Sequence, residues 1–166
     1  MGSIGADLRE NFCVIAFKEK TSGNPAGLAD DDARLRRYFR TMEENDISYL
    51  IRGCIFKVYN NLGPGLLESA YEAALGFELA NAGMEVKVQV ALPMIYQTAK
   101  VDVGYRMDLL VEDKVIIEVK SVEILLDVHH KQVITYLKLS GMKLGLLVNF
   151  NCADISKSIF RKVNKL

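Results

Sequence analysis

The stretch GYRMDLLVEDKVIIEVKS, residues 104–121, contains the pattern that decides the fold. Two apolar segments, at about 101–111 and 114–120, have the length and composition of strands. Glu112 and Asp113 lie between them and form a tight turn. We therefore predict a β-hairpin whose second strand, VIIEVK, carries two charges in an otherwise apolar run. Charges in such a strand are uncommon and need a reason.

Three charged residues of this hairpin are predicted to meet on one face. Side chains alternate between faces, so Glu118 and Lys120 share a face and Asp108 can lie opposite Glu118. Two adjacent carboxylates repel each other, and a site that keeps both usually binds a cation. The lysine can hold an attacking water or neutralise charge on a phosphate. For an isolated E-x-K motif, the alternative is a solvated surface ion pair.

The remaining segments predict a mixed α/β domain around the hairpin. Segments with apolar residues at helical spacing are expected to be helices. Segments in which polar and apolar residues alternate, or which form short apolar runs, are expected to be strands. The expected helices are 46–60, 66–82 and 128–140, and the expected further strands are 85–92, 94–97 and 144–150. A short element at 154–163 ends the chain, so the main order is α-α-β-β-β-β-α-β.

Residues 1–46 differ from the rest of the chain. They are rich in turn formers and mixed charge, and we interpret them as an N-terminal extension, which can be partly disordered or non-native. A short apolar patch at 8–17 could form a strand, and the acidic run at 30–32, followed by arginines, could begin a helix. We expect residues 47–166 to form the functional domain.

The composition limits the possible functions. Lys and Arg together number 21, as do Asp and Glu, so the net charge is zero. This balance argues against a strongly basic nucleic-acid-binding coat but does not exclude a local basic cleft. The three cysteines are far apart and odd in number, which favours an intracellular setting over a disulfide framework. Because no apolar run approaches a membrane span and no signal peptide is visible, we expect a cytoplasmic protein without a membrane partner.

The supply of metal ligands favours carboxylates. The only histidines, His129 and His130, are adjacent, so any metal must rest mainly on acids, which indicates Mg²⁺ or Mn²⁺. Glu68 is a further candidate ligand in the first turn of its helix, although a helix-start acid is the simpler interpretation. Gln132 and Tyr136 lie one helical turn apart and could contact water, phosphate or a base. The alternative for this pair is a solvated polar stripe with a half-buried tyrosine.

These motifs resemble the GxxExxY family of small proteins in the PD-(D/E)XK nuclease superfamily. The naming motif is Gly65, Glu68 and Tyr71 within LGPGLLESAY. GYRMDLLVEDKVIIEVKSVE and HHKQVITYLKLSGMKLGLLVNF follow in order, so the resemblance covers about 47–163. It implies an α/β fold with a restriction-endonuclease-like αβββαβ core, in which helices flank a mixed central sheet. Tyr59 stands where family members often carry a histidine.

The resemblance also implies roles for six residues. They are Asp108 and Glu118 as the metal acids, Lys120 as the lysine, Glu68 as the helix acid, and Gln132 and Tyr136 as a Q-x-x-x-Y pattern. We therefore expect a nuclease that hydrolyses phosphodiester bonds of nucleic acid, DNA in preference to RNA, with Mg²⁺ or Mn²⁺. The alternative is a catalytically inactive nuclease-fold module that binds or interacts. A homodimer through the first helix or the extension is a further hypothesis.

Overall fold

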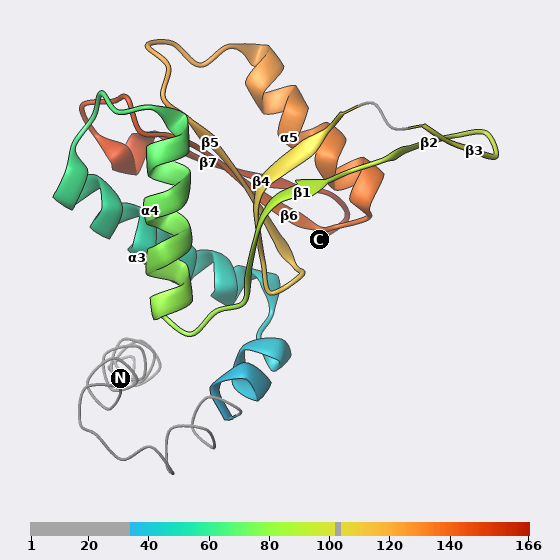
Figure 1. Cartoon of the computed structure of the whole chain (residues 1–166), viewed down its shortest axis with the longest axis horizontal. Coiled ribbons are helices and arrows are strands. Elements are labelled where there is room, and N and C mark those ends of the chain that lie inside the picture. Colours follow the sequence, from blue (N-terminus) through green and yellow to red (C-terminus); the bar gives the residue numbers. More distant parts are fainter. Residues whose placement is uncertain (1–33, 102–103) are drawn as a thin grey trace, which may run out of the picture.

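A five-stranded sheet forms the centre of the fold, which the computed structural model describes for residues 34–101 and 104–166 (Figure 1). The strand order is β1-β4-β5-β6-β7, and neighbours are antiparallel except for the parallel pair β5 and β6. The strands are β1 (Val86–Ala91), β4 (Arg106–Val111), β5 (Val115–Lys120), β6 (Leu144–Asn149) and β7 (Ile159–Val163). The sheet is mixed, as predicted.

Helix α5 (Asp127–Ser140) connects the two parallel strands. Parallel neighbours need a crossover connection, and α5 provides it by packing across one face of the sheet (Figure 1). The helix ends at Gly141, whose φ of 74° lies in the left-handed region that glycine enters without steric cost. The helix predicted at 128–140, with its end at Gly141, is confirmed.

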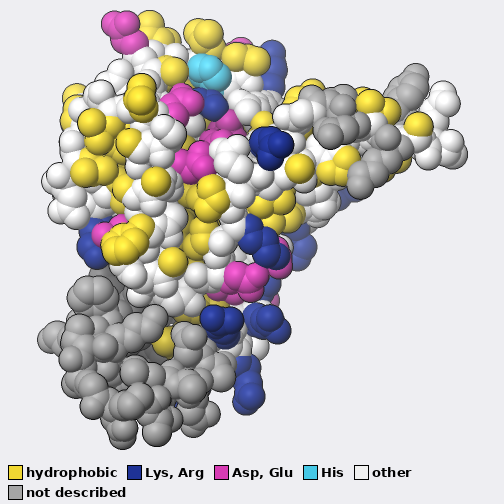
Figure 2. Space-filling view, in the orientation of Figure 1, with side chains coloured by type: hydrophobic (Ala, Val, Ile, Leu, Met, Phe, Trp, Pro, Cys, Tyr) yellow, Lys and Arg dark blue, Asp and Glu magenta, His cyan; other side chains and the backbone are white. Residues whose placement is uncertain are grey.

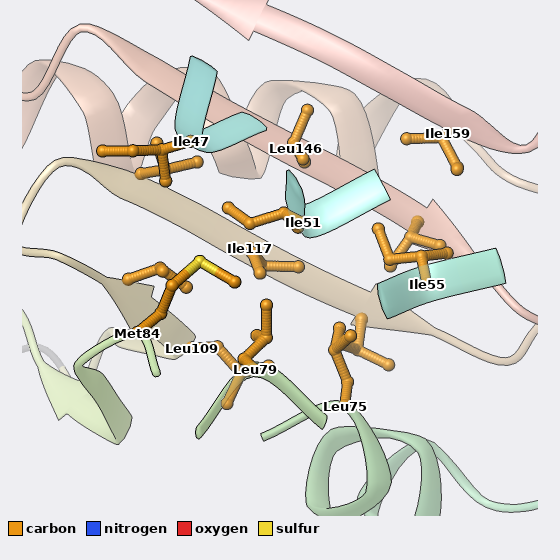
Figure 3. Close-up of a cluster of buried hydrophobic side chains, with 14 of the residues drawn as sticks. Ile47, Ile51, Ile55, Leu75, Leu79, Met84, Leu109, Ile117, Leu146 and Ile159 are labelled. Carbon is orange, nitrogen blue, oxygen red and sulfur yellow. The ribbon is translucent and has the colours of Figure 1, made fainter. Parts of the chain in front are cut away.

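Helices α3 (Glu44–Leu62) and α4 (Glu68–Asn81) cover the opposite face of the sheet (Figure 1). Ile47, Ile51 and Ile55 recur at four-residue spacing along α3, so they form one apolar stripe, and all three are fully buried. Figure 3 shows this stripe against side chains of α4 and the strands. The partners drawn there are Leu75, Leu79, Met84, Leu109, Ile117, Leu146 and Ile159.

A second, smaller core lies between α5 and the sheet. Val133 and Leu137 of α5 pack there with Ile116 and Leu147 of the two parallel strands. Because both faces of the sheet are covered, β5 and β6 are buried along almost their whole length rather than at alternate residues. Apart from two short strands of a separate sheet between β1 and β4, the elements α4, β1, β4, β5, α5 and β6 follow each other as αβββαβ, which confirms the restriction-endonuclease-like core.

The strand predicted at 101–111 is divided in the structure. Its first residue, Val101, belongs to β3 (Ala99–Val101), which pairs with β2 (Met94–Tyr96) in a separate two-stranded sheet that extends from the domain (Figure 1). Gly104 has a φ of 72°, outside the strand region, and β4 begins only at Arg106. The tail predicted as one short element is a 3-10 turn (Ile155–Lys157) followed by β7.

Part of the N-terminal segment contacts the domain. Residues 34–41 are helical, and Phe39 and Met42 are buried in the larger core. The Lys114 ammonium donates hydrogen bonds to the carbonyls of Arg40 and Met42. The strand predicted at 8–17 and the acidic run at 30–32 lie outside the described residues. Across 34–101 and 104–166, the helices are too short or too polar to cross a membrane.

Candidate functional site

The β4–β5 hairpin brings the predicted charged residues to one place. Leu109 pairs with Ile117, and the same register continued by one residue sets Asp108 level with Glu118. The Val119 N–H donates to Oδ2 of Asp108 at 2.8 Å, so the Asp108 carboxylate crosses to the neighbouring strand. Ile117 and Val119 face the α3–α4 core, whereas Ile116 faces α5. The predicted alternation of faces along β5 is therefore correct.

Glu118 and Lys120 form a buried ion pair. Oε1 of Glu118 accepts a hydrogen bond from Lys120 Nζ at 2.6 Å, and the two side chains are 1% and 13% exposed. Oε2 of Glu118 is buried without a hydrogen-bond partner among the described residues. Burying an ionised carboxylate with an unpaired oxygen costs free energy, so this site favours binding of either a proton or a cation by Glu118.

The electrostatics reflect this crowding of charges. Burial, and then the negative charge of Asp108, raise the pKa of Glu118 to about 7. Burial also raises the pKa of Asp108, although the Val119 N–H and the Lys120 charge act against it. Burial opposes the charge of Lys120, but the hydrogen bond that Lys120 donates to Glu118 and the negative charge of Glu118 outweigh this effect, so the pKa of Lys120 is raised. Lys120 therefore stays an ammonium at neutral pH.

The GxxExxY segment holds Glu68 at the start of α4. The Tyr71 ring is fully buried and stacked on Phe150 at 4.4 Å, while its hydroxyl donates to the Gly63 carbonyl and accepts from the Leu66 N–H. These bonds fix the turn before the helix. Oε1 of Glu68 accepts from the Ser121 N–H at 3.1 Å, at the end of β5. Glu68 and Tyr71 are three residues apart at the start of α4. Tyr71 therefore fixes the turn before the helix, while Glu68 binds the end of β5.

Two polar residues at the strand ends support this junction and were not predicted. The Ser121 hydroxyl donates to the Leu66 carbonyl at 2.6 Å and so ties the turn before α4 to β5. The buried Asn149 side chain accepts from the Val122 N–H and donates to the Val122 carbonyl. Both residues follow or end apolar strands, which is the sequence signal that could have identified them.

Gln132 and Tyr136 are partners on α5. The Gln132 amide donates to the Tyr136 hydroxyl at 2.7 Å. Burial raises the pKa of Tyr136, and the charges of Glu118 and Asp108 raise it further, so the tyrosine lies within electrostatic range of the carboxylates. Tyr105 packs edge-on against Tyr136 at 6.0 Å. Tyr136 is buried, with 3% of its surface exposed, and Gln132 is partly buried.

An open cavity of about 540 Å³ lies between α4 and the β1–β4 edge of the sheet. Figure 2 shows acidic side chains gathered in this region with basic ones beside them. Of the predicted site residues, Glu68 and Asp108 line the cavity. The other lining residues are Leu66, Leu67, Ser69, Glu72, Gln89 and Ser121.

Glu72 and Gln89 are the cavity residues that sequence reasoning missed most clearly. The Gln89 amide nitrogen donates to Oε2 of Glu72 at 2.8 Å and lies 3.4 Å from Oδ1 of Asp108. Glu72 follows Glu68 by four residues on α4, so helical spacing could have identified it. Gln89 carries no comparable signal, because nothing in the sequence separates it from other strand glutamines.

The donor set fits a hard divalent cation. One oxygen of each acid accepts a hydrogen bond. Asp108 accepts from the Val119 N–H, Glu68 from the Ser121 N–H and Glu118 from the Lys120 ammonium. The unpartnered second oxygen of Glu118 is what a cation would satisfy, and carboxylate oxygens are the ligands that Mg²⁺ and Mn²⁺ prefer. Within 34–101 and 104–166, no three His, Cys, Asp or Glu side chains lie close enough together to hold a metal ion between them.

Comparison with known proteins places the domain in a family. The model of a family described as the PD-(D/E)XK nuclease superfamily matches residues 45–162. No curated protein and no solved structure match the chain significantly.

Proposed function

The chain belongs to the PD-(D/E)XK nuclease superfamily, and we propose that it is a metal-dependent nuclease that hydrolyses phosphodiester bonds of nucleic acid. The superfamily implies a nucleic-acid substrate and, in general, a divalent metal. The observation that carries the proposal is the buried Glu118, which is paired with Lys120 and lies level with Asp108, and whose second oxygen has no partner in the part of the chain that the structure describes. Such a costly arrangement is typical of functional sites.

Asp108 and Glu118 would hold Mg²⁺ or Mn²⁺, with Glu68 as a further ligand. When bound, the cation would polarise the phosphate and stabilise the charge that develops on it. The Lys120 ammonium, which Glu118 holds at 2.6 Å, can donate to the attacking water or to a phosphate oxygen. Its raised pKa keeps it a donor at neutral pH.

Gln132 and Tyr136 would contact the substrate from α5. The hydrogen bond between them orients both polar groups, and a tyrosine can bind a phosphate oxygen or stack on a base. The GxxExxY motif and its hydrogen-bonded turn support membership of that family within the superfamily. We propose DNA in preference to RNA as the substrate and the cytoplasm as the location.

We further propose that residues 47–166 form the nuclease-like domain and that 1–46 are an extension of it. Phe39 and Met42 pack on the core, so the end of the extension also contributes to stability. A homodimer through α3 or the extension would bring two sites together for cleavage of two strands. Light scattering of the full chain tests this, and a strictly monomeric mass would remove it.

A binding module without catalysis is the second candidate. The zero net charge favours it, because a nucleic-acid-binding surface usually carries excess positive charge. The Tyr59 hydroxyl, at the position where family members often have a histidine, donates to the Cys152 carbonyl. Metal binding discriminates the two candidates, since a module that has lost its chemistry has no need of the cation.

The deciding experiment measures Mn²⁺ affinity by calorimetry and cleavage of single- and double-stranded DNA and RNA. We expect Mn²⁺ binding and cleavage in the wild type, and loss of cleavage in Asp108→Ala and Lys120→Ala proteins that remain folded. The exposed turn residue Asp113 gives a matched control, because Asp113→Ala removes a carboxylate of the same hairpin outside the cavity. A wild type that binds no Mn²⁺ and cuts no substrate would refute the nuclease.

A further inference from the structure

Strands β1 and β4 both change face at one point beside the site. In β4, Leu109 packs in the larger core and Met107 in the smaller one, although residues two apart share a face in a regular strand. In β1, Val86 and Val90 are divided between the two cores in the same way. The two strands therefore kink together between these residues.

Gln89 and Asp108 lie at this kink. Val88 pairs with Leu109 and Val90 with Met107, so Gln89 is level with Asp108. The φ of Gln89 is 52°, in the left-handed region that a non-glycine residue rarely adopts inside a strand. Strain of this kind is retained where the surrounding structure requires it, which is often at a functional site.

The Gln89 side chain then bridges two carboxylates. Its amide nitrogen has two hydrogens, and Oε2 of Glu72 at 2.8 Å and Oδ1 of Asp108 at 3.4 Å are their acceptors. The other Asp108 oxygen, Oδ2, accepts from the Val119 N–H at 2.8 Å. The carboxylate is thus held from both sides, with Oδ1 on the side of the Glu72–Gln89 pair and the cavity.

We propose that Gln89, anchored by Glu72, is a positioning residue for Asp108: its amide fixes the orientation in which the Asp108 carboxylate receives a cation. The left-handed backbone conformation of Gln89 produces the kink, and its side-chain amide orients the Asp108 carboxylate. This inference rests on the proposed function for the metal that Asp108 receives. The geometry of Asp108 itself does not depend on it.

Gln89→Gly separates the two parts of this role. Glycine adopts a positive φ readily, so the kink is retained while the amide is lost. Gln97→Gly is the matched control, because Gln97 also has a positive φ, of 55°, and lies in the exposed β2–β3 hairpin outside the cavity. Glu72→Ala, alone and combined with Gln89→Gly, tests whether the two residues act together.

The experiment uses the full chain and two measurements, Mn²⁺ affinity by calorimetry and the amide signal of Val119 by NMR without metal. Loss of an outer-shell partner typically weakens metal binding by about 10-fold or more, and we expect this for Gln89→Gly together with a shifted Val119 signal. Thermal unfolding should show both glycine variants folded. The double variant should bind no more weakly than Gln89→Gly, since both changes break one bridge.

Two results would overturn the positioning role. One is a Gln89→Gly protein whose Mn²⁺ affinity is within twofold of the wild type, and the other is an unchanged Val119 signal. Multiplicative losses in the double variant would also refute the shared bridge. If the wild type binds no Mn²⁺, the proposed function fails, and the Val119 signal alone then decides whether Gln89 sets Asp108.

Discussion

Replacing Glu118 by glutamine tests the central electrostatic feature of the site. Glutamine has nearly the same shape and can still accept from Lys120 through its side-chain oxygen, but it cannot ionise. Glu118 is 1% exposed, so solvent screens its charge only weakly. The substitution therefore removes the cost of a buried negative charge while the packing stays almost unchanged.

The size and sign of the effect follow from the pKa of Glu118. Folding raises this pKa from 4.5 to about 7, and one pKa unit corresponds to about 1.4 kcal/mol. Below pH 4.5 the carboxyl is protonated in both the folded and unfolded states, so it causes no difference. As pH rises from 4.5 to about 7, the free energy of unfolding falls, and above pH 7 it is lower by about 3 kcal/mol.

Urea unfolding of both proteins in EDTA at several pH values measures this difference directly. We expect Glu118→Gln to match the wild type near pH 4.5 and to be more stable by about 3 kcal/mol at pH 8. Glu123→Gln, at an exposed position, should show no such trend. A difference that does not depend on pH, or a wild type that gains stability relative to Glu118→Gln as pH rises, would refute a buried, destabilised carboxylate.

Three further outcomes are expected. Mn²⁺ affinity, measured by calorimetry, should rise about tenfold per pH unit up to about pH 7 and then level, because the cation must displace the Glu118 proton; a flat profile would contradict this. Tyr71→Phe should cost about 2 kcal/mol in urea unfolding, since it removes two hydrogen bonds but keeps the ring stack, and an unchanged midpoint would show that the turn does not need them. Gly145→Ala should cost about 1–3 kcal/mol in the same assay, because the new methyl group would lie 2.7 Å from Val133; unchanged stability would show that α5 moves away freely.

The hairpin was predictable because its physics is local. A turn between two apolar runs determines which residues pair, and the period of two then places Glu118 and Lys120 on one face. The helices were predictable for a similar reason, since Ile47, Ile51 and Ile55 mark a buried stripe and Gly141 marks an end. These features predicted the order α-α-β-β-β-β-α-β, whereas the αβββαβ core was implied by the resemblance to the nuclease family.

The parts that were missed depend on contacts between distant segments. Ser121 reaches Leu66, and Asn149 reaches Val122, through hydrogen bonds that no sequence period encodes. The division of the strand at 101–111 has a local cause, Gly104, but a single glycine in an apolar run does not show whether the chain bends or continues. Tertiary pairing decides between those outcomes.

The kink at Gln89 is a feature of β1 and β4 that strict alternation of side chains does not predict. Strict alternation would put Met107 and Leu109 in one core, yet they lie in two, with Asp108 between them. In a regular strand, Met107 and Leu109 would share one face of the sheet, and Asp108 would lie on the other face, among the side chains of one helix layer. The reversal instead places it at the edge between α4 and β5, where Glu68, Glu72 and the end of β5 converge. The left-handed conformation of Gln89, which interrupts the alternation of both strands, therefore brings Asp108 to this group of acids.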